Sequence, residues 1–166
     1  IRCKSSPGFL VNRALLPYMF GAIEAVVSGE NPEKIDQAMV DFGMPMGPIE
    51  LCDQVGLDVC LDVGTVLGIG PGAEKLLKSK CDEKTFGRKT GSGFYDWSEN
   101  RAVRSRESLE PKLSDDIARR MLAPLVDECI KAVQEGVVDS SDDADAGMIL
   151  GTGFPGFRGG PINWTS

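Results

Sequence analysis

The chain has 166 residues, of which 42% are hydrophobic and 26% charged, a globular composition that excludes wholesale disorder. The net charge of −7, from 18 basic and 25 acidic residues, disfavours nucleic acid as a partner. No apolar run approaches the roughly 20 residues that cross a bilayer, so we expect no membrane span.

The residues that are missing or unpaired exclude further classes of chemistry. The chain contains no histidine, which rules out Ser-His-Asp hydrolysis, Cys-His proteolysis and His-ligated zinc within it. Its five cysteines form no C-x-x-C pair. Because Cys52, Cys60 and Cys129 fall in apolar helical contexts, we expect buried free thiols and a reducing, intracellular compartment. We predict no metal site.

A basic stretch interrupts this acidic chain. Between Lys75 and Arg106, nine basic residues accompany four acidic ones. The stretch is either a solvated connector or a surface that meets a phosphorylated small molecule, and both interpretations stay open.

Apolar periodicity predicts helices in the first part of the chain. Residues 9–27 form one long amphipathic helix, which Gly29 ends. Asn31 caps a second helix, Pro32 occupies its first turn, and Gly43 ends it.

The middle of the chain is less regular. A third helix is expected from residue 48 to about residue 67, with Val55 and Val59 among its inward side chains. One or two short helices follow, and then a glycine- and lysine-rich loop that leads into a short extended segment, residues 87–97. Residues 100–112 are charged and poorly patterned, which is typical of a linker.

A second long helix, capped by Ser114-Asp115-Asp116, is expected to end at Gly136. It repeats the first long helix at an offset of 107 residues, with seven identities in 17 positions. The identical pairs are Arg13/Arg120, Leu15/Leu122, Pro17/Pro124, Ile23/Ile130, Ala25/Ala132, Val26/Val133 and Gly29/Gly136. An interior proline costs about 3 kcal/mol in a helix. Its presence at equivalent places therefore indicates duplication of one kinked helical unit.

Further matches extend the repeat beyond the long helices. They are Asp36/Asp145, Met39/Met148, Gly43/Gly153, Pro45/Pro155 and Gly47/Gly160. We predict an all-α fold in which this helical unit occurs twice. The first repeat would span residues 1–98, a linker 99–113, and a second, truncated repeat 114–166.

Three motifs are candidates for chemistry. Gly68-x-Gly70-x-x-Ala73 matches the dinucleotide fingerprint as a string, but a helix precedes it instead of a strand, so an interhelical turn is the better interpretation. Lys89 stands between glycines, where a point charge could meet phosphate, or it is an ordinary loop lysine. Asn12 lies in an apolar helix, and its equivalent in the second repeat is Arg119. Either it is an exposed helix residue or it belongs to a site in the first repeat alone.

The chain resembles the C-terminal helical region of the NAD-dependent 3-hydroxyacyl-CoA dehydrogenases, a helical domain also found in 6-phosphogluconate dehydrogenases. The resemblance rests on SPGFLVNR at residues 6–13, GMPMGPIEL at 43–51 and GRKTGSGFY at 87–95. GTGFPGFRGGP at residues 151–161 resembles the duplicated tail of multifunctional β-oxidation enzymes.

This resemblance implies roles for two residues. Asn12 would be the catalytic amide that orients the acyl-CoA substrate, and Lys89 would reach the phosphate or ribose region of NAD. The glycine-rich NAD loop and the His–Glu pair of the family lie on a preceding Rossmann domain, which would be the main binding site for NAD. The chain begins at Ile1 instead of methionine, and we expect it to be a piece of a longer protein that is inactive in isolation.

The resemblance also implies partners and a setting. We expect an acyl-CoA substrate, the preceding Rossmann domain and a possible homodimer as partners. The compartment would be the cytoplasm of a bacterium, or the mitochondrion or peroxisome of a eukaryote. The alternative is a stand-alone helical dimerisation or interaction module that kept the scaffold without the chemistry.

Overall fold

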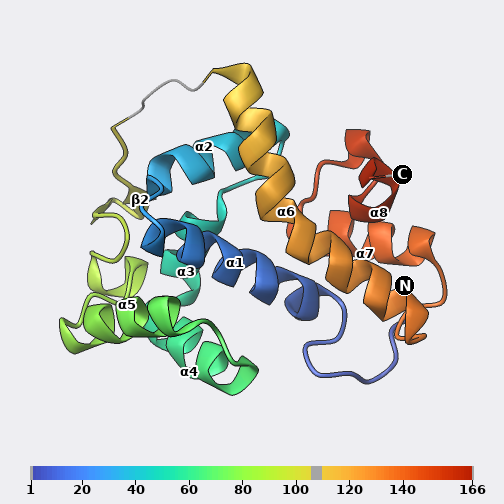
Figure 1. Ribbon diagram of the computed structural model, residues 1–166, viewed down its shortest axis with the longest axis horizontal. Coiled ribbons are helices and arrows are strands. Elements are labelled where there is room, and N and C mark those ends of the chain that lie inside the picture. Colours follow the sequence, from blue (N-terminus) through green and yellow to red (C-terminus); the bar gives the residue numbers. More distant parts are fainter. Residues whose placement is uncertain (1, 106–109, 166) are drawn as a thin grey trace.

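Two long helices, α1 (Val11–Val27) and α6 (Pro111–Gln134), pack against each other at the centre of the molecule. The computed structural model describes residues 2–105 and 110–165 (Figure 1). The remaining elements, in chain order, are α2 (Pro32–Phe42), α3 (Pro48–Val55), α4 (Leu57–Leu67), α5 (Pro71–Asp82), η1 (Arg88–Thr90), β1 (Trp97–Ser98), β2 (Arg101–Ala102), α7 (Ser141–Thr152), η2 (Gly156–Arg158) and α8 (Pro161–Thr165). The predicted all-α fold is confirmed.

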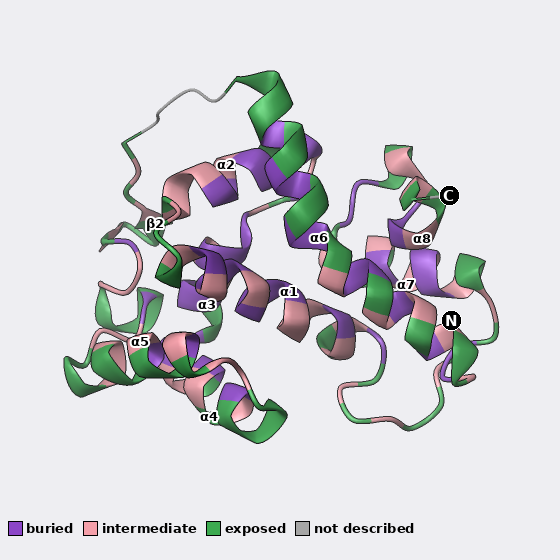
Figure 2. Ribbon diagram, viewed as in Figure 1, coloured by how far each residue is buried: buried purple, intermediate pink, exposed green. Residues whose placement is uncertain are grey.

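The core forms where α1 and α6 meet the shorter helices. Figure 2 shows buried residues along the facing sides of α1, α2 and α6. Tyr18 and Ile23 of α1 and Leu122 and Leu125 of α6 are at most 1% exposed. The three cysteines that were expected to be buried are buried, and all five cysteines of the described chain are free thiols. Within the described residues, no helix is long and apolar enough to cross a membrane.

Each repeat contains the same connection between two of its helices, α2 to α3 in the first and α7 to α8 in the second, which we call its joint. In each, a buried aspartate accepts two hydrogen bonds from the backbone N–H groups that follow a Gly-Pro pair. The donors are Ile49 and Glu50 for Asp36, and Ile162 and Asn163 for Asp145, at distances from 2.7 to 3.0 Å. A Cβ atom at Gly47 would lie 2.1 Å from Asp36, and one at Gly160 would lie 2.2 Å from Asp145. The aspartate therefore lies so close to the glycine of each pair that a residue with a side chain does not fit there.

Contacts between the repeats are reciprocal. A Cβ atom at Gly43 would lie 2.9 Å from Pro155, and one at Gly153 would lie 3.0 Å from Pro45. Reciprocal contacts between matched residues are what an approximate two-fold axis produces. The duplication predicted from sequence is therefore present in the structure, and its two copies face each other across α1 and α6.

The expected third helix was wrong in one respect. It is two helices, because Gly56 adopts φ +107° and ψ +127° and ends α3 before α4 begins. This change of direction leaves Val55 and Val59 43% and 42% exposed instead of inward. A continuous periodicity across residues 48–67 cannot show such a break, because glycine adopts this conformation without a steric penalty.

The second long helix also begins earlier than predicted. It starts at Pro111, and Ser114 is a buried residue of its first turn whose hydroxyl donates to Asp41 at 3.2 Å. Residues 97–102, across the boundary between the expected first repeat and the linker, form a two-stranded hairpin. Its first strand adjoins the predicted extended segment, whereas its second strand and the pairing were not predicted. Residues 106–109 of that linker lie outside the described residues. The division of the chain at residues 98 and 113 stays a prediction.

Candidate functional site

An apolar groove of about 240 Å³ lies between α1, α3 and α4 in the first repeat. It is lined by Asn12, Leu15, Leu16, Met19, Leu51, Val55, Val59, Cys60 and Val63. Asn12 contributes the carboxamide at one end of an otherwise apolar wall. Such a groove suits an apolar ligand that carries a hydrogen-bonding group at one position.

The helical repeat of α1 explains how Asn12 reaches the groove. Asn12, Leu16 and Met19 are spaced by four and three residues, which places them on one face of the helix. Asn12 is exposed, and among the described residues its side chain has no hydrogen-bond partner. The amide is therefore available to a ligand in the groove.

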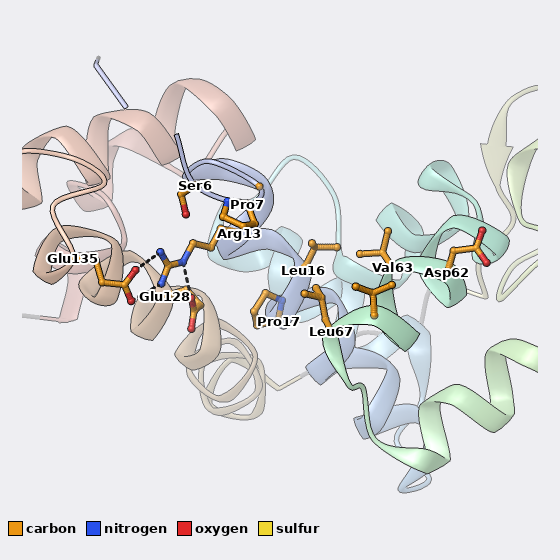
Figure 3. A pocket seen from close by; sticks show the side chains of 12 residues that line it. Ser6, Pro7, Arg13, Leu16, Pro17, Asp62, Val63, Leu67, Glu128 and Glu135 are labelled. Carbon is orange, nitrogen blue, oxygen red and sulfur yellow. Dashed lines mark hydrogen bonds and ion pairs between the residues drawn. The ribbon is translucent and has the colours of Figure 1, made fainter. Parts of the chain in front are cut away.

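A second, larger cavity of about 840 Å³ lies between α1, α4 and α6 and shares Leu16 and Val63 with the groove (Figure 3). Its polar wall contains Arg13, which Figure 3 shows turned toward Glu128 of α6 and Glu135, the C-cap residue of that helix. The Arg13 Nη1 atom lies 2.6 Å from Glu135, and Nε lies 3.0 Å from Glu128. Hydrogen bonds to Glu135 and Glu128 raise the pKa of Arg13.

Lys89 lies in a different place from Asn12. It belongs to η1, and its Nζ atom is 2.5 Å from the carboxyl oxygens of Asp58 in the first turn of α4. The hydrogen bond from Lys89 lowers the pKa of Asp58. Among the described residues, no hydrogen bond or ion pair joins Lys89 to Asn12. Helix α4 lies next to both: Asp58 pairs with Lys89, and the adjacent Val59 lines the groove that contains Asn12. The lysine is 46% exposed and accessible to a ligand at this edge.

The loop that carries Lys89 is held by a buried carboxylate that sequence analysis missed. Asp53 is 0% exposed and accepts hydrogen bonds from the backbone N–H groups of Phe94 and Tyr95 and from the Trp97 indole. These three bonds are 2.9 to 3.0 Å long. The aromatic part of the GSGFYDW motif is therefore an anchor for the loop. No local signal in the sequence pairs Asp53 with residues more than forty positions away.

A second buried carboxylate, Asp36, joins the same loop to the joint of the first repeat. Besides its backbone donors, it accepts a hydrogen bond from the Tyr95 hydroxyl at 2.7 Å. Burial raises the pKa of Asp36 to about 6, although Tyr95, the backbone donors and Arg104 act in the opposite direction. Burial is also the main cause of the raised pKa of Asp145, its equivalent in the second repeat. The two aspartates match in structure and in the direction of their pKa shifts.

The dinucleotide-like string at Gly68 is an interhelical turn, as predicted. It connects α4 to α5, and a Cβ atom at Gly70 would lie 2.1 Å from the carboxylate of Glu24 in α1. The glycine at position 70 is thus explained by the approach of Glu24. As for metals, the described residues contain no group of three His, Cys, Asp or Glu side chains that could hold an ion.

Comparison with known proteins agrees with this architecture. Residues 8–97 match the family model of the 3-hydroxyacyl-CoA dehydrogenase C-terminal domain. The chain belongs to this family. The matched residues of this dehydrogenase domain include Asn12, the groove and Lys89, and the resemblance inferred from sequence is confirmed.

Relatives of this C-terminal domain match over almost the whole chain. The fatty acid oxidation complex subunit alpha of Vibrio cholerae is 37% identical to this chain. The aligned region covers 97% of this chain and 25% of that subunit. The subunit of the same name from Idiomarina loihiensis is also 37% identical, over 97% of this chain and 25% of that subunit. The chain therefore spans about a quarter of the length of the curated relatives it matches.

Solved structures of dehydrogenases share the fold of the domain. A 3-hydroxybutyryl-CoA dehydrogenase from Escherichia coli has a TM-score of 0.74 at 23% identity, covering 99% of this chain and 53% of that one. An (S)-3-hydroxybutyryl-CoA dehydrogenase from Ralstonia eutropha is 38% identical with a TM-score of 0.52, covering 60% of this chain and 38% of that one. The first of these likenesses shows the fold alone.

Proposed function

We propose that this chain is the substrate-binding helical part of an NAD-dependent 3-hydroxyacyl-CoA dehydrogenase of fatty-acid β-oxidation. The intact protein would oxidise (S)-3-hydroxyacyl-CoA with NAD⁺ to 3-oxoacyl-CoA, NADH and a proton. The observation that carries the proposal is the groove, in whose apolar wall stands the Asn12 amide, which has no hydrogen-bond partner in the described part of the chain. The family membership and the names of the relatives support the same assignment.

The residues of the groove fit an acyl-CoA better than a charged ligand. The walls supply apolar contact for carbon chains, and Asn12 can donate to or accept from an oxygen of the substrate near the reacting carbons. A neutral amide acts by orientation and by stabilising developing charge, so it needs no titration. This is the role that we propose for Asn12.

NAD, when bound, would supply the acceptor for the hydride that leaves C3 of the substrate. Lys89 is the residue of this chain that we propose for the cofactor, at its phosphate or ribose region. Its ammonium group is exposed and is held in place by Asp58, so a bound anion would share it with that carboxylate.

The rest of the catalytic machinery would come from a preceding nucleotide-binding domain of the same polypeptide. The chain contains no histidine to act as the general base that removes the 3-hydroxyl proton. Exposed apolar side chains at the end of α4, with Val66 85% and Leu67 57% exposed, supply a surface on which such a domain could rest. We therefore expect the purified chain alone not to reduce acetoacetyl-CoA with NADH.

The decisive experiment replaces Asn12 in the full-length protein. We expect Asn12→Ala to lower kcat/KM about 10²-fold, equivalent to about 2.7 kcal/mol of transition-state stabilisation. Arg119→Ala, at the equivalent position of the second repeat, is the matched control and should change kcat/KM less than about twofold. A loss below about threefold for Asn12→Ala would place this residue outside the catalytic machinery.

A second experiment tests the cofactor side. Lys89→Ala should weaken NAD binding, with little change in the affinity for acyl-CoA, because the lysine pairs with Asp58 and does not line the groove that contains Asn12. Titration of each ligand against the variant distinguishes the two effects. Weaker acyl-CoA binding with unchanged NAD binding would assign the loop to the substrate instead.

A further inference from the structure

Three successive residues at the start of α1 contact three different parts of the molecule. Asn12 lines the groove of the first repeat. Val11, on one side of it, packs so closely on α7 that a Cβ atom at Gly151 would lie 2.6 Å from Val11 Cγ2. Arg13, on the other side, forms its ion pairs with α6. Both neighbours of the candidate catalytic amide are therefore held by the second repeat.

The first turn of α1 has no side-chain cap, although the Arg13 N–H group donates to the Gly8 carbonyl at 3.3 Å. Its N-cap residue, Leu10, makes no side-chain capping hydrogen bond. Phe9, just before it, adopts φ +51°, a left-handed conformation that is unfavourable for a bulky residue. An N-terminal helical turn without a cap frays readily. The position of Asn12 thus depends on contacts made by its neighbours.

Arg13 makes the strongest of these contacts. Its guanidinium group bonds both oxygens of Glu135, at 2.6 and 3.0 Å, and Nε bonds Glu128 at 3.0 Å. A planar guanidinium that bonds two carboxylates in this way fixes the orientation of its own backbone more firmly than a single surface ion pair does. The Arg13 and Glu128 side chains are 16% and 18% exposed, so solvent screens this ion pair only in part, whereas Glu135 is 55% exposed.

The duplication supplies a natural comparison for Arg13. Arg120 is its equivalent in α6 and forms an ion pair with Glu30, which follows α1. This second pair has one carboxylate in place of two, and the Arg120 side chain is 53% exposed. Its neighbour is Arg119, not an amide, so the same interhelical contact recurs where there is no candidate catalytic group.

We propose that Arg13 is a positioning residue, through which the second repeat holds the Asn12 amide in register with the groove. The inference rests on the function proposed for Asn12. It gives the second repeat a role in the reaction although that repeat has no equivalent amide. Arg13 acts through Asn12 and does not touch the substrate.

The test is a set of kinetic measurements on the full-length protein with 3-hydroxyacyl-CoA and NAD⁺. We expect Arg13→Gln to lower kcat about tenfold with KM changed less than about twofold, because misplacement of an orienting group reduces turnover more than binding. Arg120→Gln should change kcat less than about twofold while removing an equivalent interhelical ion pair. Arg13→Lys, which keeps the charge without the planar fork, should give an intermediate kcat and guards against a variant that fails to fold.

The double variant Asn12→Ala/Arg13→Gln separates positioning from general stability. If Arg13 acts through Asn12, replacing it in the Asn12→Ala background should cost less than about twofold in kcat. An undiminished tenfold loss in that background, or an equal loss in Arg120→Gln, would overturn the inference and leave the function of Asn12 intact. If Asn12→Ala alone is without effect, the proposed function fails, and the role of Arg13 fails with it.

Discussion

The two repeats share their joints and differ in their surfaces. Both carry a long helix with an interior proline, an arginine that pairs across to the other repeat, and a buried aspartate that receives the backbone after Gly-Pro. The first repeat alone, among the described residues, adds α4, α5 and the loop of residues 87–97. It also has Asn12 where the second has Arg119.

This difference separates architecture from function within one chain. A feature present in both repeats supports the helical unit itself, as Asp36 and Asp145 do, and Arg13 differs from its counterpart Arg120 by the second carboxylate that it bonds. A feature found in one repeat needs a separate reason. Asn12, the groove and Lys89 belong to this second group, and we assign them roles in ligand binding.

The largest stability effect that we expect comes from the anchor found in the first repeat. Asp53→Ala would leave two backbone N–H groups and the Trp97 indole without their acceptor, at a cost of about 4 kcal/mol. Urea unfolding measures the loss. Asp53→Asn retains one acceptor oxygen and should lose less. Equal losses for the two variants would show that the charge matters more than the hydrogen bonds.

The shared joint predicts similar costs in both repeats. Gly47→Ala and Gly160→Ala each place a Cβ atom within 2.2 Å of a buried aspartate and should cost about 3 kcal/mol. Gly160→Ala should cost more, because Gly160 also has φ +108°. The same unfolding experiment compares the two variants. A loss of unfolding free energy well below this value for Gly160→Ala would mean that the second joint is loosely packed. The repeats would then be less alike than their hydrogen bonds indicate.

Asp36 gives a pH-dependent prediction. Its folded-state pKa of about 6 lies above the ordinary value of 3.8, so its contribution to stability is full below about pH 4 and decreases as pH rises to about 6. The decrease would reach about 3 kcal/mol. The Asp36→Asn variant should lack this step, so the free energy of unfolding of the wild type should fall relative to the variant between these pH values. Parallel curves would contradict the shift.

The smallest effect concerns the ion pair at the edge of α4. Both side chains are about 40% exposed or more, so Lys89→Ala should change the free energy of unfolding by less than about 1 kcal/mol. A calorimetric scan measures this. A small stability change together with weaker NAD binding would sharpen the distinction between residues that hold the fold and residues that serve the ligand. A large stability change would make Lys89 a structural residue.

Sequence patterns predicted the architecture well where the signal was local. Asn31 caps α2, accepting from the N–H of Glu33 at 2.8 Å, and Gly43 ends the helix in the left-handed conformation, as expected. The break at Gly56 was missed because the apolar pattern continues across it. Serine next to acidic residues is a common helix start and predicts a cap at Ser114, whereas the helix begins at Pro111.

The candidate site was less accessible from sequence. Asn12 and Lys89 came from the family resemblance, and periodicity alone left both with ordinary alternatives. Asp53 and Arg13 depend on partners 41 to 122 residues away along the chain, which no local pattern can identify. Contacts of this kind appear only when the fold brings the helices together.

Because both repeats belong to one chain, the contact between α1 and α6 is an intramolecular association. Two separate copies of such a unit would need a concentration near their dissociation constant to pair. Covalent linkage replaces that requirement with an effective concentration, which is set by the part of the chain that connects the two helices. The ion pairs of Arg13 with α6 should therefore persist at any dilution of the protein, and so should the arrangement of the groove that they support.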